Sequence, residues 1–274
     1  MPDTSTAPDS LTRWLDREAT LRIMAIEATT LSRGLCLLHD LEGEAASEFA
    51  QALTGGLLWA SDLKAGQTLS LQIELGTRTL HVDATPVGLV RGMVTQRTHE
   101  SPIARVTIRR FGSSGILYQS VVDTPARTVA EALEGHSRQS DQQNAMADLR
   151  CELDSQGLPR RAYGALLRDF PSTPAGSLAN LVAAWRARGD WKAPTPCLGL
   201  DERTWDRLSH QEIHHHCPCS RDRALNSIRA LGEPALRQAA EVGETMEVVC
   251  DFCRSTYTFE AVEFLPGAEG ALEA

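Results

Sequence analysis

Four of the seven cysteines lie in the last quarter of the chain, where they form two close pairs. Cys217 and Cys219 are separated by one proline, Cys250 and Cys253 by two residues, and thirty residues lie between the pairs. Two pairs of thiols are what a tetrahedral zinc site requires, and in a reducing compartment this pattern favours metal over disulfides. We therefore predict one zinc ion per chain, bound by these four cysteines. Four protein ligands leave no position open for water, so hydrolytic zinc chemistry is not expected.

Other side chains that can bind metal or react lie outside this pattern. His214, His215 and His216 immediately precede Cys217 and could in principle ligate or tune the metal, although four thiolates already complete the tetrahedron. The remaining cysteines are isolated in mostly apolar stretches, where a free cysteine behaves as a small buried hydrophobe. A structural role is expected for Cys36, Cys151 and Cys197.

The sequence around the two pairs predicts the elements that position them. Ser220 is suited to cap a helix with an apolar face that ends at Gly232, and Pro234 can start a second helix. Strands are expected over 245–249 and 256–259, on either side of the second pair. The apolar face of the first helix consists of Ala224, Leu225, Ile228 and Leu231. Because a unit of about 50 residues is too small for a sufficient core, we expect it to unfold without zinc.

The first two thirds of the chain combine strand and helix patterns. A strand-like stretch at 21–25 precedes a helical pattern at 45–53, and residues 68–75 alternate strictly between apolar and polar side chains. A turn is expected at Gly76-Thr77, and a helix from Thr124-Pro125 to about residue 142. Further strands, which suggest antiparallel hairpins, are expected at 80–84, 87–94, 103–110 and 116–122.

These patterns predict an α+β fold: an N-terminal antiparallel sheet domain with packed helices, a helical linker and a small C-terminal zinc-binding domain. The boundaries follow changes in composition. We expect a disordered N-terminus at 1–16, the α+β core at 17–170, a linker punctuated by proline and glycine at 171–210, the zinc domain at 211–265 and a tail at 266–274.

The predicted linker contains one short helix that Ser177 can cap and Gly189 can end. Its apolar face consists of Leu178, Leu181, Val182 and Trp185. An apolar helix face of this kind has to be covered by another part of the protein. Two interpretations stay open, in which the helix is docked on the first domain either permanently or conditionally.

Charge and composition exclude several classes of function. The 27 basic and 36 acidic side chains give a net charge of −9, which disfavours nonspecific binding to DNA or RNA. The longest charge-free run, 170–185, is too short and too polar to span a bilayer. The N-terminus lacks the basic start and apolar stretch of a secretory signal, so a cytoplasmic location without a membrane partner is expected.

The residues around the cysteines resemble a known family. The runs 217–223 and 249–253, with Leu231-Gly232 and Tyr257-Thr258-Phe259, look like the C-terminal zinc domain of the heat-shock protein 33 family of redox-regulated chaperones. Upstream, Ser140-Asp141-Gln142 resembles that family's Ser-Glu-Gln segment, and the stretch from Gly164 to Pro171 resembles its glycine-rich strand. Arg168 departs from the pattern, since the family tends to have glutamine there, and 208–216 is shortened.

The resemblance implies a cytosolic holdase that binds unfolded client proteins and is not an enzyme. In that family the reduced, zinc-bound form is inactive. Oxidants convert the thiolates to two disulfides, here Cys217–Cys219 and Cys250–Cys253, release zinc, unfold the zinc domain and linker, and expose a client-binding surface. The resemblance also implies a second copy of the chain as a partner, in a homodimer of the oxidised form.

Three other classes of function also use clustered cysteines. A zinc-ribbon nucleic-acid module would use arginines beside the cysteines, but 211–264 carries five arginines against nine acids. A thiol oxidoreductase would place Cys-x-x-Cys at a helix N-terminus, whereas Cys250 and Cys253 lead into a predicted strand. A constitutive binding protein with a purely structural zinc site remains the strongest alternative.

Overall fold

The computed structural model describes residues 8–18, 20–170, 173–174, 176–188, 203–243, 245–260 and 263, without the side chains of 184–188. The chain divides into two compact units, Met1–His216 and Cys217–Ala274, and each is described by itself. The second unit thus begins at Cys217, the first of the four C-terminal cysteines, and not at residue 211 as the composition suggested.

One sheet of the first unit has five antiparallel strands in the order β6-β7-β2-β1-β8. The strands are β1 (Ser10–Asp16), β2 (Leu21–Glu27), β6 (Ala145–Leu153), β7 (Pro159–Asp169) and β8 (Trp205–Glu212). The expected disorder of 1–16 is therefore wrong for 10–16, and the expected linker ends earlier than residue 210. Both differences have one cause. Strands β1 and β8 pair with each other, although nearly the whole sequence of the first unit lies between them.

The second sheet is a long meander of β3 (Thr68–Ala84), β4 (Leu89–Gly112) and β5 (Gly115–Thr124), with β9 (His214–His215) pairing in parallel with β4. The alternation at 68–75 correctly indicated β3. The turn expected at Gly76 is wrong: this glycine, with a φ of 55°, sits at an irregularity in register and β3 continues past it. The reversal lies at 85–88, where Gly88 has a φ of 85°.

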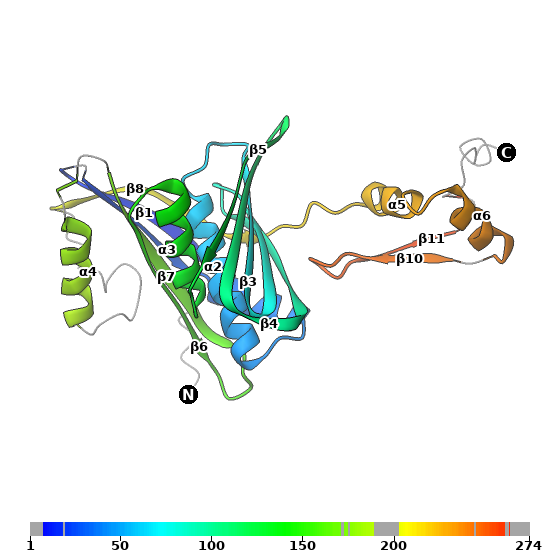
Figure 1. The fold of residues 1–274 in the computed structure, drawn as a ribbon, viewed down its shortest axis with the longest axis horizontal. Helices are drawn as coiled ribbons and strands as arrows, with labels where there is room; N and C mark the ends of the chain where they lie inside the picture. The colour runs from blue at the N-terminus through cyan, green and yellow to red at the C-terminus, as the bar shows by residue number, and fades with distance from the viewer. Residues whose placement is uncertain are drawn as a thin grey trace. The chain divides into compact units, whose positions relative to one another are not determined.

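Among the described residues of this unit, three helices contribute to the main core and a π-helical turn follows the third (Figure 1). They are α1 (Thr29–Leu38), α2 (Gly43–Ala60), α3 (Val129–His136) and the π-helical η1 (Ser137–Asp141). Helix α2 packs against strands of both sheets, and most of its side chains are buried. Helix α3 begins later than expected, because Thr128 forms a capping box with Glu131 and replaces Thr124 as the cap. Helix α1 was not predicted.

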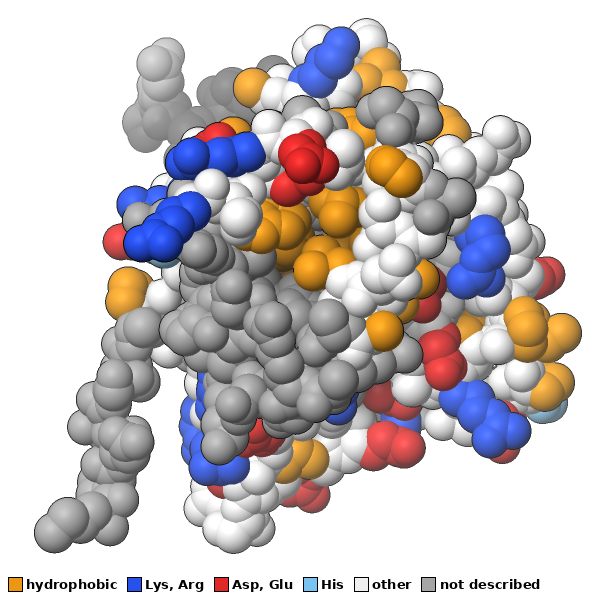
Figure 2. All heavy atoms as spheres, turned by 90° about the vertical axis from the view of Figure 1, so that its left-hand side faces the viewer, with side chains coloured by type: hydrophobic (Ala, Val, Ile, Leu, Met, Phe, Trp, Pro, Cys, Tyr) orange, Lys and Arg blue, Asp and Glu red, His pale blue; other side chains and the backbone are white. Residues whose placement is uncertain are grey.

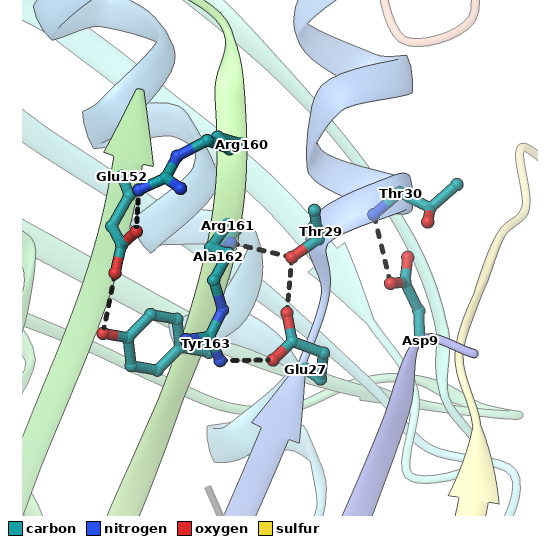
Figure 3. Close-up of polar contacts among 9 residues, drawn as sticks. All are labelled: Asp9, Glu27, Thr29, Thr30, Glu152, Arg160, Arg161, Ala162 and Tyr163. Atoms are coloured by element: carbon teal, nitrogen blue, oxygen red, sulfur yellow. Dashed lines mark hydrogen bonds and ion pairs between the residues drawn. The ribbon is translucent and has the colours of Figure 1, made fainter. Parts of the chain in front are cut away.

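Polar side chains from distant segments fix the start of α1 (Figure 3). Ala28 precedes this helix and offers no side-chain cap. Asp9 takes that role, accepting hydrogen bonds from the backbone N–H groups of Thr30 and Leu31 at 3.1 and 2.5 Å. The hydroxyl of Thr29 accepts from the N–H of Ala162 at 3.0 Å and so ties the helix to β7. The start of α1 therefore depends on tertiary contacts.

The outer face of the five-stranded sheet carries a second apolar cluster, covered by α4 (Ser177–Arg188). Successive residues of β2 alternate between faces, so Ile23 belongs to this cluster while Met24 belongs to the main core. Leu178 and Val182 of α4 are buried in the cluster, and Leu181 is half-buried against it. Figure 2, which faces this side of the molecule, shows hydrophobic side chains gathered in a hollow.

Two glycines in helices of this unit provide a test of its packing. A Cβ atom at Gly56 of α2 would lie 2.6 Å from Cγ1 of Val82, whereas nothing lies within 4 Å of one at Gly34 of α1. Gly56→Ala is expected to lower the free energy of unfolding by about 1–3 kcal/mol through overpacking. Gly34→Ala, the matched control, is expected to raise it by about 0.5–1 kcal/mol through helix propensity. Denaturant unfolding of both variants measures the effects, and stabilisation by both would contradict the close approach of α2 to β3.

The described residues of the second unit form two helices and one hairpin, as the sequence predicted. They are α5 (Arg221–Arg229), α6 (Glu233–Glu241), β10 (Met246–Val249) and β11 (Thr256–Phe259). Ser220 caps α5 by accepting from the N–H of Arg223. Leu231 was wrongly placed on the buried face, since α5 ends before it and it is 59% exposed. The buried apolar residues in the described part of this unit are Ala224, Ile228, Leu236, Ala239 and Phe259.

Among the described residues, no helix has the length and apolar character needed to cross a membrane.

Candidate metal centre

Two local structures bring the four cysteines of the second unit together. Cys250 directly follows β10, and the chain turns through Asp251 to Cys253 before β11 begins. The N–H of Cys250 donates to the carbonyl of Ser255, and the N–H of Arg254 donates back to the carbonyl of Cys250. Cys217 and Cys219 lie in the irregular segment that ends where Ser220 starts α5. The hairpin and the helix start thus present one pair of thiols each.

The sulfur atoms have the spacing of a metal site. All four Sγ atoms lie within 4.8 Å of one another. Cys217 Sγ is 3.7 Å from Cys250 Sγ, and Cys219 Sγ is 3.3 Å from Cys253 Sγ. Zinc–sulfur bonds of about 2.3 Å in a tetrahedron place sulfur atoms about 3.8 Å apart, so the cluster fits a single zinc ion. The cysteines are free thiols and half-buried.

The ionisation of the cluster also favours a cation. Burial alone would raise the pKa of Cys253, but contacts with the hydroxyl and N–H of Ser255 and with neighbouring thiols lower it to about 6. The hydroxyl of Tyr257 donates to Cys219 and lowers its pKa, yet burial and the other three thiols raise it to about 12. Several adjacent thiolates repel one another unless a positive charge lies between them. A bound dication would remove this repulsion and let all four sulfurs ionise.

Residues that the cysteine spacing did not reveal hold the cluster in place. Tyr257 Oη lies 3.1 Å from Cys219 Sγ, and Ser255 Oγ lies 3.3 Å from Cys253 Sγ. Arg221 stacks on Phe259, 4.3 Å from the ring centre, and binds both carboxylate oxygens of Glu263. The sequence marked Tyr257 by its place in the strand after the second pair and by the Tyr257-Thr258-Phe259 run of the family resemblance, but neither signal assigned it a contact with a thiol. These contacts orient the ligands around the cluster.

The other predicted metal-binding or reactive residues, the histidines before Cys217 and the isolated cysteines, are not part of the sulfur cluster among the described residues. His214 and His215 form β9 in the first unit, and His214 is 3.5 Å from Glu212. The group of described residues that could hold a metal contains the four cysteines and no histidine. Burial raises the pKa of Cys36 to about 12 and that of Cys151 to about 11, as expected for structural thiols. The remaining predicted residues Cys197 and, for its side chain, Trp185 lie outside the described part of the chain.

Comparison with known proteins gives one consistent result. The family model described as Hsp33 protein matches residues 9–260. The 33 kDa chaperonin of Pelobacter propionicus is 27% identical over 96% of this chain and 95% of its own length, and that of Syntrophotalea carbinolica is 27% identical over 93% and 97%.

A solved structure agrees with the fold described above. The crystal structure of the 33 kDa chaperonin (heat shock protein 33 homolog) from Thermotoga maritima superposes with a TM-score of 0.80 and covers 94% of this chain and 97% of its own, at 19% sequence identity. With the family match over residues 9–260, the α+β architecture and the cluster of four cysteines, this chain belongs to the Hsp33 family of chaperones.

Proposed function

We propose that the protein is a redox-regulated holdase in the cytoplasm, which binds unfolding proteins under oxidative stress. The reduced form, with zinc held by Cys217, Cys219, Cys250 and Cys253, is inactive. Oxidation removes the zinc ligands, and the C-terminal unit and the linker then unfold. The observation that carries this proposal is the cluster of four thiols in a unit with only five buried apolar residues among those described. Membership of a family whose relatives are named chaperonins supports it.

The redox step balances with a peroxide as the oxidant. A cysteine thiolate attacks one peroxide oxygen, which gives a sulfenic acid and, with a proton, one water. The thiol of its partner attacks the sulfenic sulfur, and a second water leaves as the disulfide forms. Each pair thus loses two electrons and two protons to one peroxide. The four cysteines are half-buried, so a small oxidant has access to them.

The surface under α4 is the client-binding surface in this proposal. Leu178 and Val182 cover apolar side chains of the sheet, including Trp14, Ile23 and Leu167. A helix of 12 residues is marginally stable by itself, so α4 depends on this docking. Undocking would expose a contiguous apolar patch, which is typical of surfaces that bind other proteins.

The decisive experiment measures suppression of aggregation of a heat-unfolded client. The proposal expects no suppression by the reduced, zinc-loaded protein, strong suppression after peroxide at elevated temperature, and its loss after reduction with zinc. Equal suppression before and after oxidation would instead identify a constitutive binding protein with a structural zinc site.

The order of disulfide formation is a separate prediction. A disulfide needs Cα atoms roughly 4.4–6.8 Å apart, which a two-residue spacer in a turn satisfies easily. The single spacer Pro218 has a fixed φ and holds the Cα atoms of Cys217 and Cys219 near the upper limit of this range, so a disulfide between them is strained. Mild oxidation is therefore expected to join Cys250 to Cys253 first. Mass-spectrometric mapping of thiols during a peroxide time course tests it. A Cys217–Cys219 bridge appearing first would show that reactivity, not ring strain, controls the order.

A further inference from the structure

A polar cavity in the first unit is used neither by the cysteine cluster nor by α4. It has a volume of about 340 Å³ and lies where the end of α2 meets strands of both sheets and the π-helical η1. Three arginines from three different strands line it: Arg22 of β2, Arg110 of β4 and Arg168 of β7. Guanidinium groups from three strands therefore converge on one cavity.

The charges that line the cavity do not balance. Asp62 forms ion pairs with two of the arginines: its carboxylate lies 3.1 Å from Arg22 Nη1 and 2.5 Å from Arg168 Nη1. Asp141 lies 3.4 Å from Arg110 Nη2. Three guanidinium groups therefore face two carboxylates, and one positive charge is left among the lining residues.

Hydrogen-bond donors around the cavity are also left over. The Nε atoms of Arg22, Arg110 and Arg168 are buried and have no hydrogen-bond partner among the described residues, and the same is true of Nε1 of Trp59. Arg168 is the most significant of them, because it is only 6% exposed. Burial outweighs the nearby Asp62 and lowers the pKa of its guanidinium group. Buried charged donors without acceptors are costly, so an acceptor is expected.

The walls of the cavity leave space for more than a bare ion. Leu63, Leu69 and Ile108 supply apolar surface, and the Arg168 guanidinium lies over the Trp59 ring, 5.3 Å from its centre. The volume falls within the roughly 300–1,000 Å³ of small-molecule sites. Apolar walls with a few convergent polar groups fit a ligand with one charged group and a compact apolar body.

The segment that brings Asp141 to the cavity has a special backbone. Residues 137–141 form a π-helical turn, and Gln142 ends it with a φ of 52° in the left-handed region. Turns of this kind are rare in proteins, and those that exist are often found at functional sites. We propose that this cavity binds a small molecule that carries one oxyanion group, a carboxylate or a phosphate, on an apolar body. The oxyanion neutralises the excess charge and accepts hydrogen bonds from the unpaired arginine N–H groups.

Calorimetric titration of the reduced, full-length, zinc-loaded protein tests this site. The probes are benzoate and phenyl phosphate, which share a ring and differ in their oxyanion, with benzyl alcohol as the uncharged control. Both anions are expected to bind saturably, and the tighter one identifies the preferred group. Arg168→Gln is expected to raise the dissociation constant at least tenfold, since it removes the central buried charge.

Two further variants separate a built site from general attraction and from misfolding. Arg105→Gln is the matched control, because this exposed arginine of β4 pairs with Asp123 and its loss changes the net charge equally. It is expected to leave both affinities unchanged within twofold. Arg110→Gln, at a half-exposed side chain, is expected to weaken binding even if Arg168→Gln fails to fold. Absence of saturable binding by both anions, equal binding of benzyl alcohol, or equal weakening by Arg105→Gln would overturn the proposal.

Discussion

Replacing Cys250 by serine is expected to abolish zinc binding and to unfold the C-terminal unit of the reduced protein. A serine oxygen is a poor substitute for a thiolate at a zinc site. The buried apolar residues described in this unit number five, two of them alanines. Structural zinc contributes about 10–16 kcal/mol in small zinc-dependent domains, far more than such a core can replace. Loss of one ligand therefore removes the main source of stability.

Zinc analysis and hydrogen exchange measure this effect, with Cys151→Ser as the matched control. Cys151 is a half-buried thiol of β6 in the first unit and lies outside the sulfur cluster. In Cys250→Ser, amides of 217–260 should lose protection while those of 20–170 keep it. The control should retain one zinc per chain and full protection in both units. Full zinc retention by Cys250→Ser would remove this residue from the ligand set.

The cysteine cluster could be predicted because its signal is local. Each pair is close in sequence, and metal chemistry demands that the pairs meet, so spacing alone was sufficient. The same holds for the strict alternation of β3 and for the cap at Ser220, where neighbouring residues carry the pattern.

Elements defined by distant partners could not be predicted. β1 looked like a polar, disordered N-terminus, yet it is held between β2 and β8, and Thr12 contacts His210 at 2.9 Å, 198 residues away. Helix α1 has no cap of its own and depends on Asp9. The arginines of the cavity come from three strands that are far apart in sequence, so no spacing revealed them. Long-range pairing, not local propensity, decides these features.

The docking of α4 gives the second large expected effect. Val182→Asp is expected to undock the helix and make the reduced protein suppress client aggregation without oxidant. Val182 is 7% exposed and packs in the cluster that includes Trp205 of β8 and Ile23 of β2. Burying a carboxylate there costs several kcal/mol, more than the roughly 1.5–3 kcal/mol that one buried valine contributes. The helix then loses its support and melts, since 12 residues are marginal by themselves.

Ala183→Asp is the matched control, because it adds the same charge at the next residue, on the exposed side of α4. Hydrogen exchange over 177–188 is measured first, in the reduced protein with zinc and without client. Val182→Asp should lose protection there, whereas the control should keep it and remain inactive. If Val182→Asp loses this protection and still fails to suppress aggregation, docking of α4 does not control activity, and the client-binding surface lies elsewhere. If both variants become active, added charge and not undocking is the cause. The predicted pattern, activity only where the apolar face is exposed, would instead link the surface under α4 directly to client binding.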